Sequence, residues 1–253
     1  MKMMKVFGLC ACVISLALFC GKNKVTGPGG NPPGAVSDRS DTLAVRAILD
    51  SNGLATIPAG DPSIVELRLV GNSIHRIYKL MLGNKAIHVI PARIKDLTAM
   101  EILQLDTNTI TSLPPEIGSC TSLVRIQLSN NQLSTVPAEL SSLHNLSGLV
   151  LSHNSITALP QSLWSMTSLE QLYLDYNQLP AIPADVSNLT LLAMLALNNN
   201  ALTTLPSSLT TLANVAILID NNNICPNTLP TTFAGWIDNR AEPDWRTTQG
   251  TCP

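Results

Sequence analysis

Aliphatic residues return at fixed offsets through most of the chain, and successive copies of the pattern lie 23 residues apart. Residues 123–137 read LVRIQLSNNQLSTVP, and residues 146–160 read LSGLVLSHNSITALP. Equivalent copies begin at Met100, Leu169 and Leu192. An earlier copy begins at Ile77, a shortened first copy at Ile64 and the last copy near Val215. A period of this length predicts a solenoid built from stacked coils.

Each copy predicts one short strand followed by an inward-turning asparagine. Leucines alternate with other residues in the LxxLxL stretch, which places them on one face of a strand. An amide both donates and accepts hydrogen bonds, so successive asparagines can satisfy backbone groups exposed where the coil bends. Lys85 takes this place in the copy from Ile77, and either Asn222 or Asn223 could take it in the last copy. Asn222 is favoured because the alternative buries Asp220. The expected ladder contains Asn72, Asn108, Asn131, Asn154, Asn177, Asn200 and Asn222.

The consensus LxxLxLxxNxLxxLPxxIxxLxx resembles the leucine-rich-repeat family over Ile64 to Ile224. That resemblance implies an α/β solenoid, a curved array with one short parallel strand per repeat over residues 64–224. Extended or 3-10 turns are expected on the convex side, where proline after the third leucine block needs no backbone donor. Helix is expected mainly in the caps.

The N-terminal end of the array requires a cover, because a terminal coil has no neighbour on one side. Residues 39–63 are expected to form a helical N-terminal cap. The helix begins near Ser40 and stops at Gly53. Its buried stripe is predicted to contain Leu43, Ala47 and Ile48.

Residues 225–253 are expected to form the C-terminal cap. A short helix near Thr231 would place Phe233, Trp236 and Ile237 on one side. Cys225 and Cys252 predict a disulfide in an exported protein, and the tail resembles the disulfide-closed cap of some exported leucine-rich-repeat proteins. Cys120 falls on a core position of its repeat.

The N-terminus predicts export. Lys2 and Lys5 precede an apolar run from Val6 to Phe19, which is too short to span a bilayer. Cys20 follows, and residues 21–38 form a Gly/Pro-rich tether. Residues 1–20 therefore resemble a bacterial lipoprotein signal with Cys20 as the lipidation site, although Phe19 departs from the small residue usual before the cysteine. A plain secretory signal is the alternative. Because Gly21 is not aspartate, the resemblance favours an outer-membrane lipoprotein of the cell envelope over a secreted protein.

Composition and spacing argue against chemistry and against nucleic acid. The net charge is -2, the pI is about 6.0, and 13 % of residues are charged. The four histidines share no metal-ligand spacing, and no nucleotide or nucleophile motif is present. Asp106 and Asp175 lie three repeats apart, roughly 14 Å, which is too far for paired acid/base catalysis. We therefore expect no catalytic, metal-binding or cofactor-binding residues, and a membrane contact only through a lipid anchor.

The outward residues of the strands form the expected functional surface, the concave face. Tyrosine and arginine, enriched at interaction hot spots, gather in the middle of the array. We expect a non-catalytic binding module for a protein or glycan ligand, with a passive envelope component or a secreted effector-like protein as alternatives. The predicted contact residues are Arg125, Gln127, Val150, His153, Tyr173, Asp175, Tyr176 and Met194.

Overall fold

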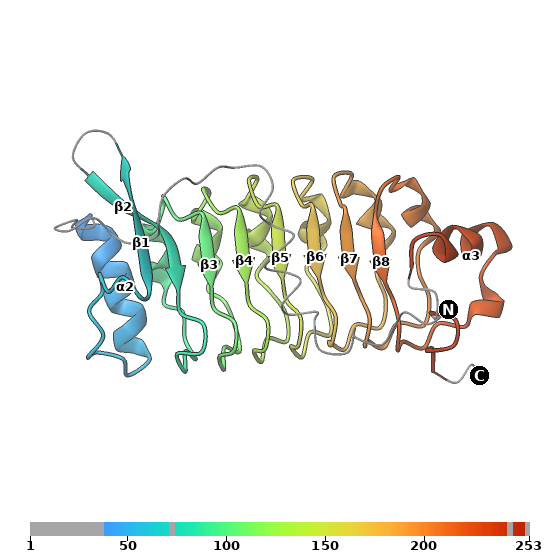
Figure 1. Ribbon diagram of the computed structural model, residues 1–253, viewed down its shortest axis with the longest axis horizontal. Coiled ribbons are helices and arrows are strands. Elements are labelled where there is room, and N and C mark those ends of the chain that lie inside the picture. The colour runs from blue at the N-terminus through green and yellow to red at the C-terminus, as the bar shows by residue number, and fades with distance from the viewer. Residues whose placement is uncertain (1–37, 71–73, 242–244, 251–253) are drawn as a thin grey trace, which may run out of the picture. The chain divides into compact units, whose positions relative to one another are not determined.

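A computed structural model describes residues 38–70, 74–241 and 245–250. Its eight strands form one sheet in chain order, and from β2 onward each pair of neighbours is parallel (Figure 1). Equivalent residues of successive repeats pair, as Leu103 does with Ile126. The strands are β1 Val65–Val70, β2 Ile74–Met81, β3 Ile102–Gln104, β4 Arg125–Gln127, β5 Gly148–Val150, β6 Gln171–Tyr173, β7 Met194–Ala196 and β8 Ala216–Leu218.

The first predicted copy is not a parallel coil, which corrects the expectation for residues 64–74. β1 pairs with β2 antiparallel, with Val65 opposite Leu80. A parallel pair needs a crossover of about a dozen residues, whereas these strands are joined by residues 71–73 alone, so only a hairpin can form. Leu69, expected inside, is 52 % exposed. Asn72 lies outside the described residues.

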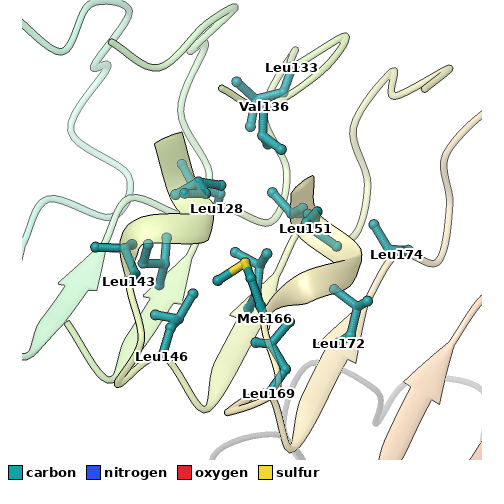
Figure 2. Close-up of a cluster of buried hydrophobic side chains, with 14 of the residues drawn as sticks. Leu128, Leu133, Val136, Leu143, Leu146, Leu151, Met166, Leu169, Leu172 and Leu174 are labelled. Atoms are coloured by element: carbon teal, nitrogen blue, oxygen red, sulfur yellow. The ribbon is translucent and has the colours of Figure 1, made fainter. Parts of the chain in front are cut away.

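The core is a continuous stack of aliphatic side chains inside the coils. Figure 2 shows Leu128, Leu151 and Leu174, equivalent residues of three successive coils, and Leu146 and Leu169 of the same core cluster. The central residue of each strand from β3 to β8 is fully buried. Each coil thus supplies apolar surface to the coil on either side, and this mutual burial drives folding.

Short 3-10 turns form the other side of the coils and confirm the expectation of short helical turns. Proline precedes each of the first six turns with φ between −63° and −74°, the range its ring fixes. The turns are η1 Ala92–Asp96, η2 Pro115–Ser119, η3 Ala138–Ser142, η4 Gln161–Ser165, η5 Ala184–Asn188, η6 Ser207–Thr211 and η7 Pro226–Thr228. Cys120 is buried and is the free cysteine of the described residues; burial raises the pKa of its thiol to about 12.

Asparagine side chains connect each coil to the preceding one. The Asn177 Oδ1 accepts from the Ile156 N–H over 3.0 Å. Its Nδ2 donates to the Leu151 carbonyl at 2.9 Å and to the Leu174 carbonyl at 3.0 Å. The same arrangement recurs at Asn108, Asn131, Asn154, Asn200 and Asn222. In the last coil, Ile217, Ile219 and Ile224 are fully buried, the arrangement expected when Asn222 occupies the ladder.

The N-terminal helix α2, Arg39–Ser51, buries a stripe that matches the predicted one only in part. Ile48 is buried as predicted, but Leu43 is 43 % exposed and Ala47 is half-buried, while Ala44, Val45 and Leu49 are buried. The reason is electrostatic. The buried Asp41 carboxylate accepts from the Arg76 guanidinium at 2.7 and 2.9 Å and from the Ile77 N–H at 2.7 Å, and these bonds hold the Asp41 side of the helix inward.

Asn52, directly after α2, satisfies backbone groups of the first coil. Its Oδ1 accepts from the backbone N–H groups of His88 at 2.6 Å and Val89 at 2.9 Å. Its Nδ2 donates to the Ile48 and Val89 carbonyls. The local sequence around Asn52 gives no sign of this role, because its partners lie 36 and 37 residues further along the chain.

The C-terminal helix α3, Thr231–Asp238, buries Phe233 and Ile237, while Trp236 is half-buried against the core. Trp245 is 1 % exposed and donates from Nε1 to Asp238 at 2.9 Å. Cys225 is buried, and its expected partner Cys252 lies outside the described residues.

Replacing Asn177 with alanine should destabilise the protein by about 2–4 kcal/mol, because the Ile156 N–H and the Leu151 carbonyl lose a buried partner. Equilibrium urea denaturation measures the change. Asn188→Ala, at an exposed position of η5, is the control and should shift the free energy of unfolding by less than about 0.5 kcal/mol. Equal effects of the two substitutions would contradict the ladder's role.

Candidate partner-binding face

The parallel register brings the predicted contact residues onto neighbouring strands. Gln127 pairs with Val150, and Val150 pairs with Tyr173, so these side chains follow one another across β4, β5 and β6. Met194 begins β7 beside Gln171. Arg125 begins β4, while the remaining three predicted residues, His153, Asp175 and Tyr176, lie in the loops directly after β5 and β6.

The predicted contact residues differ widely in accessibility. Tyr176 is 45 % exposed and His153 is exposed, whereas Arg125, Gln127, Tyr173 and Met194 are half-buried. Val150 and Asp175 are each only 7 % exposed. Sequence periodicity gives the direction of a side chain but not how far its neighbours cover it. The accessible part of the predicted surface therefore centres on His153 and Tyr176.

Asp175 is held inside the face rather than presented to solvent. Burial raises the pKa of its carboxyl above the ordinary aspartate value, and hydrogen bonding to Ser152 partly offsets that effect. The Ser152 hydroxyl donates to the Asp175 carboxylate over 2.5 Å. Asp175 therefore links two coils and is less available as a contact residue than predicted.

The residue before each ladder asparagine has a left-handed backbone. Asn130, Asn199 and Asn221 occupy this position with φ of 53–56°, which asparagine tolerates better than most residues. Thr107 and Tyr176 adopt the same conformation at φ of 57° and 54°. Such a conformation is strained for branched or bulky side chains, and strain of this kind concentrates at functional sites. Equivalent positions along the repeat thus carry unequal backbone strain.

His153 and Tyr176 occupy this left-handed position in adjacent coils and stack on each other. Their ring centroids are 4.0 Å apart, and the ring planes are inclined by 12°. An aromatic pair contributes about 0.5–1.5 kcal/mol beyond its buried area, which offsets part of the strain at Tyr176. The stack forms an exposed aromatic platform at the end of β5 and β6.

Two further polar residues of the strand face, Gln171 and Asn198, lie outside the predicted contact set. Gln171 begins β6, and Asn198 lies just after β7. The Gln171 Oε1 and the Asn198 Oδ1 are shielded from solvent and have no hydrogen-bond partner. Their neighbours at equivalent positions of adjacent repeats, such as Gly148 and Met194 beside Gln171, could have indicated this isolation.

A small apolar cavity lies elsewhere on the array. Its volume is about 310 Å³, and its lining includes Leu159, Trp164, Leu179 and Ile182 from two successive coils. Trp164 is 3 % exposed, so its ring packs into the core. The cavity contains no ionisable side chain and is separate from the strand face.

Neither a metal site nor a membrane span emerges from the part of the chain that the structure describes. Within it, no group of three histidine, cysteine, aspartate or glutamate residues is arranged to hold a metal ion. None of the helices in the same part is long and apolar enough to cross a bilayer.

Replacing Thr107 with asparagine should stabilise the protein by about 1 kcal/mol, because asparagine accepts the left-handed backbone more readily than a β-branched residue. Asn130→Thr makes the reverse change one coil later and should lower stability by a similar amount. Urea denaturation of both variants and the parent measures the effect. If the Thr107→Asn protein is no more stable than the parent, the left-handed backbone at Thr107 is not strained.

Comparison with known proteins supports the interpretation of the fold as a leucine-rich-repeat solenoid. Residues 121–179 match the family described as leucine rich repeat. No curated protein matches the chain. Among solved structures, that of PEPR1-AtPEP1 is 27 % identical over 73 % of this chain and 28 % of that chain, with a TM-score of 0.60.

Two further solved structures are similar. A TDR receptor is 33 % identical over 53 % of this chain and 24 % of that chain, with a TM-score of 0.50. The leucine-rich-repeat ectodomain of the receptor kinase SOBIR1 from Arabidopsis thaliana is 24 % identical over 66 % of this chain and 95 % of that one, with a TM-score of 0.57. The chain spans about a quarter of the TDR receptor chain and of the PEPR1-AtPEP1 chain. The protein therefore has a leucine-rich-repeat-like solenoid fold with a series of parallel strands and short helical turns.

Proposed function

We propose that this protein is a non-catalytic, exported binding module whose strand face contacts a protein or glycan partner. The observation that carries the proposal is the exposed His153–Tyr176 stack, which lies beside a row of half-buried side chains on β4 to β7. Tyrosine and arginine are enriched among the residues that supply most of the binding energy at protein interfaces, and tyrosine buries a large area at little entropic cost.

The rigidity of the face supports this function. Its strands are short, but every inward neighbour is buried, and the asparagine ladder fixes the loops that follow the strands. A preformed surface loses little conformational freedom when it binds, so more of the contact energy contributes to affinity.

The similar structures favour a protein as partner. Two of them are a receptor and the ectodomain of a receptor kinase, and proteins of this fold are typically interaction modules. This chain spans only about a quarter of the TDR receptor chain, so the likeness supports the kind of partner and not its identity. The proposed binding mode is that of a folded solenoid that presents one surface to a ligand.

Export and anchoring complete the proposal. The apolar run before Cys20 and the tether after it would place the solenoid outside the cell, at the end of a spacer anchored by acyl chains. In an oxidising compartment Cys225 would pair with Cys252 and close the C-terminal cap, whose helix packs against the last coils.

Immobilised full-length protein should capture a saturable partner from cell extract, and replacing Tyr173 and Tyr176 with serine should abolish the capture. Both tyrosines contribute contact area on the strand face. The matched control is Leu191→Ser, which also removes a large exposed side chain, 60 % exposed, outside the predicted contact set. Quantitative pull-down measures the effect. Absence of a saturable partner, or equal capture by all variants, would support a passive structural role instead.

Intact mass of the protein extracted from membranes should show acyl chains on Cys20. The Cys20→Ser chain should carry no acyl chain at residue 20, because serine lacks the thiol that receives it. A mature chain that is cut near Gly21 and carries no acyl group would instead indicate plain secretion.

A further inference from the structure

We propose that the N-terminal end of the solenoid docks on an anionic bilayer surface through exposed residues of α2 and of the segment around η1. The cap surface is defined here by five exposed residues, Arg39, Leu43, Val89, Arg93 and Lys95. It shares no residue with the strand face, so this docking goes beyond the binding function proposed above.

Charge is distributed unevenly along the chain. Residues 1–95 contain 12 lysine and arginine residues against 5 aspartate and glutamate residues, whereas residues 96–253 contain 3 against 12. The net charge of -2 therefore conceals a basic N-terminal part and an acidic remainder. An asymmetry of this kind is typical of proteins that contact an anionic surface with one end.

The cap surface carries residues that the equivalent positions of the other coils do not use. Arg93 is replaced there by Glu116, Glu139, Ser162, Asp185 and Ser208, and Lys95 by Gly118, Ser141, Trp164, Ser187 and Thr210. Val89 is replaced by Ser112, Thr135, Ala158, Ala181 and Thr204. All these coils form the same 3-10 turn, so the turn itself requires neither the two cations nor the valine.

Hydrogen bonds show that the segment around η1 runs along α2. Asn52, directly after the helix, accepts from the Val89 N–H at 2.9 Å. Near the start of the helix, the Arg76 Nη2 donates to the Asp41 carboxylate at 2.7 Å and to the Asp96 carbonyl at 3.3 Å. Residues 89–96 therefore lie beside α2 from its end to its beginning, and the cap surface occupies the end of the array opposite α3 (Figure 1).

The carboxylates beside the cap surface are already paired. Asp41 pairs with Arg76 at 2.7 Å, and Asp50 pairs with Arg46 at 2.8 Å. Asp96 pairs with Arg93 at 3.0 Å, but this pair is exposed and contributes little. Among the described residues, no carboxylate forms an ion pair with Arg39 or Lys95. Two cations are thus left for an anionic partner.

A bilayer fits the cap surface better than a soluble polyanion does. Leu43 and Val89 are 43 % and 44 % exposed, and a nucleic acid or an acidic polysaccharide would leave these aliphatic side chains in water. At a membrane interface, cations meet the anionic headgroups while apolar side chains enter the boundary of the acyl chains.

The anchor proposed at Cys20 belongs to the same end of the molecule. Residues 21–37 can span at most about 60 Å, so an anchored Cys20 keeps the cap surface near the headgroups. The acidic remainder of the chain is repelled by the same headgroups. Docking would therefore orient the array with its C-terminal cap away from the bilayer.

Tryptophan fluorescence tests docking separately from anchoring. Full-length protein with Leu43→Trp is mixed with vesicles of phosphatidylcholine alone or with added anionic phosphatidylglycerol, each containing a brominated lipid that quenches nearby indoles. Quenching beyond that of the parent, which has three tryptophans, is expected on the anionic vesicles and should decrease with added salt. Leu191→Trp, at a site that is 60 % exposed in another coil, is the control and should not be quenched beyond the parent.

Arg93→Glu combined with Lys95→Ser, in the Leu43→Trp protein, should weaken docking at least about tenfold, because each cation near an anionic surface contributes about fivefold. Both substitutions introduce residues that other coils carry at these positions. Adding Glu139→Arg and Ser141→Lys restores the net charge at η3, and it should not restore the quenching.

Circular dichroism establishes that each variant is folded, and Lys95→Ser alone, with a reduction of about fivefold, decides the matter if the double variant is not. Absence of quenching on anionic vesicles overturns the proposal, and protein that still sediments with those vesicles would leave the anchor intact. Equal quenching on both kinds of vesicle, or quenching that survives the double variant, also overturns it. Retention on an immobilised acidic polysaccharide without quenching would assign the cap surface to a soluble polyanion instead. Capture of a partner through Tyr176 is measured separately, so the strand-face function stands or fails independently.

Discussion

Everything in this structure depends on each coil completing its neighbour. A single coil cannot bury its leucines or pair the backbone groups that its bends expose, and it acquires both only from the coils on either side. The six asparagines from Asn108 to Asn222 serve the second need, with each amide bridging two coils. The same bonds recur between equivalent atoms of successive coils. They therefore fix the register of the strands, and residues at the same repeat position follow one another across the outer face.

The same dependence makes the ends of the array different from its middle. At the N-terminal end the chain uses means that are not repeated elsewhere: a buried carboxylate, Asp41, paired with Arg76, and an amide, Asn52, that binds backbone of the first coil. Removing one partner of a buried ion pair leaves an uncompensated charge, so such a pair fixes the orientation of α2 more strictly than apolar packing alone. At the other end Phe233, Ile237 and Trp245 supply apolar cover.

Sequence periodicity predicted the features that recur in every repeat, but it did not predict the features that occur only once. The strands, the 3-10 turns and the inward asparagines follow from one 23-residue pattern, because each position has many equivalents that constrain it. The hairpin of β1 and β2 could have been derived from its three-residue connection, but the pattern of Leu67 and Leu69 suggested another coil. The inward face of α2 depends on Arg76, 35 residues beyond Asp41, and no local pattern contains that information. At the candidate site, periodicity placed Tyr176 outward correctly but could not foresee that neighbours would cover Val150 and Asp175.

In a repeat protein, a residue that differs from the residues at the same position of the other repeats is the best indication of function. The fold demands a left-handed residue before each ladder asparagine, and asparagine meets that demand with least strain. Tyr176 is less favourable than asparagine for this left-handed backbone. Its exposed ring does not contribute to the core, so folding alone does not explain a tyrosine at this position. Because each residue at this position can be compared with its equivalents in the same molecule, His153 and Tyr176 stand out as its two aromatic side chains, and they stack on each other in the loops after β5 and β6.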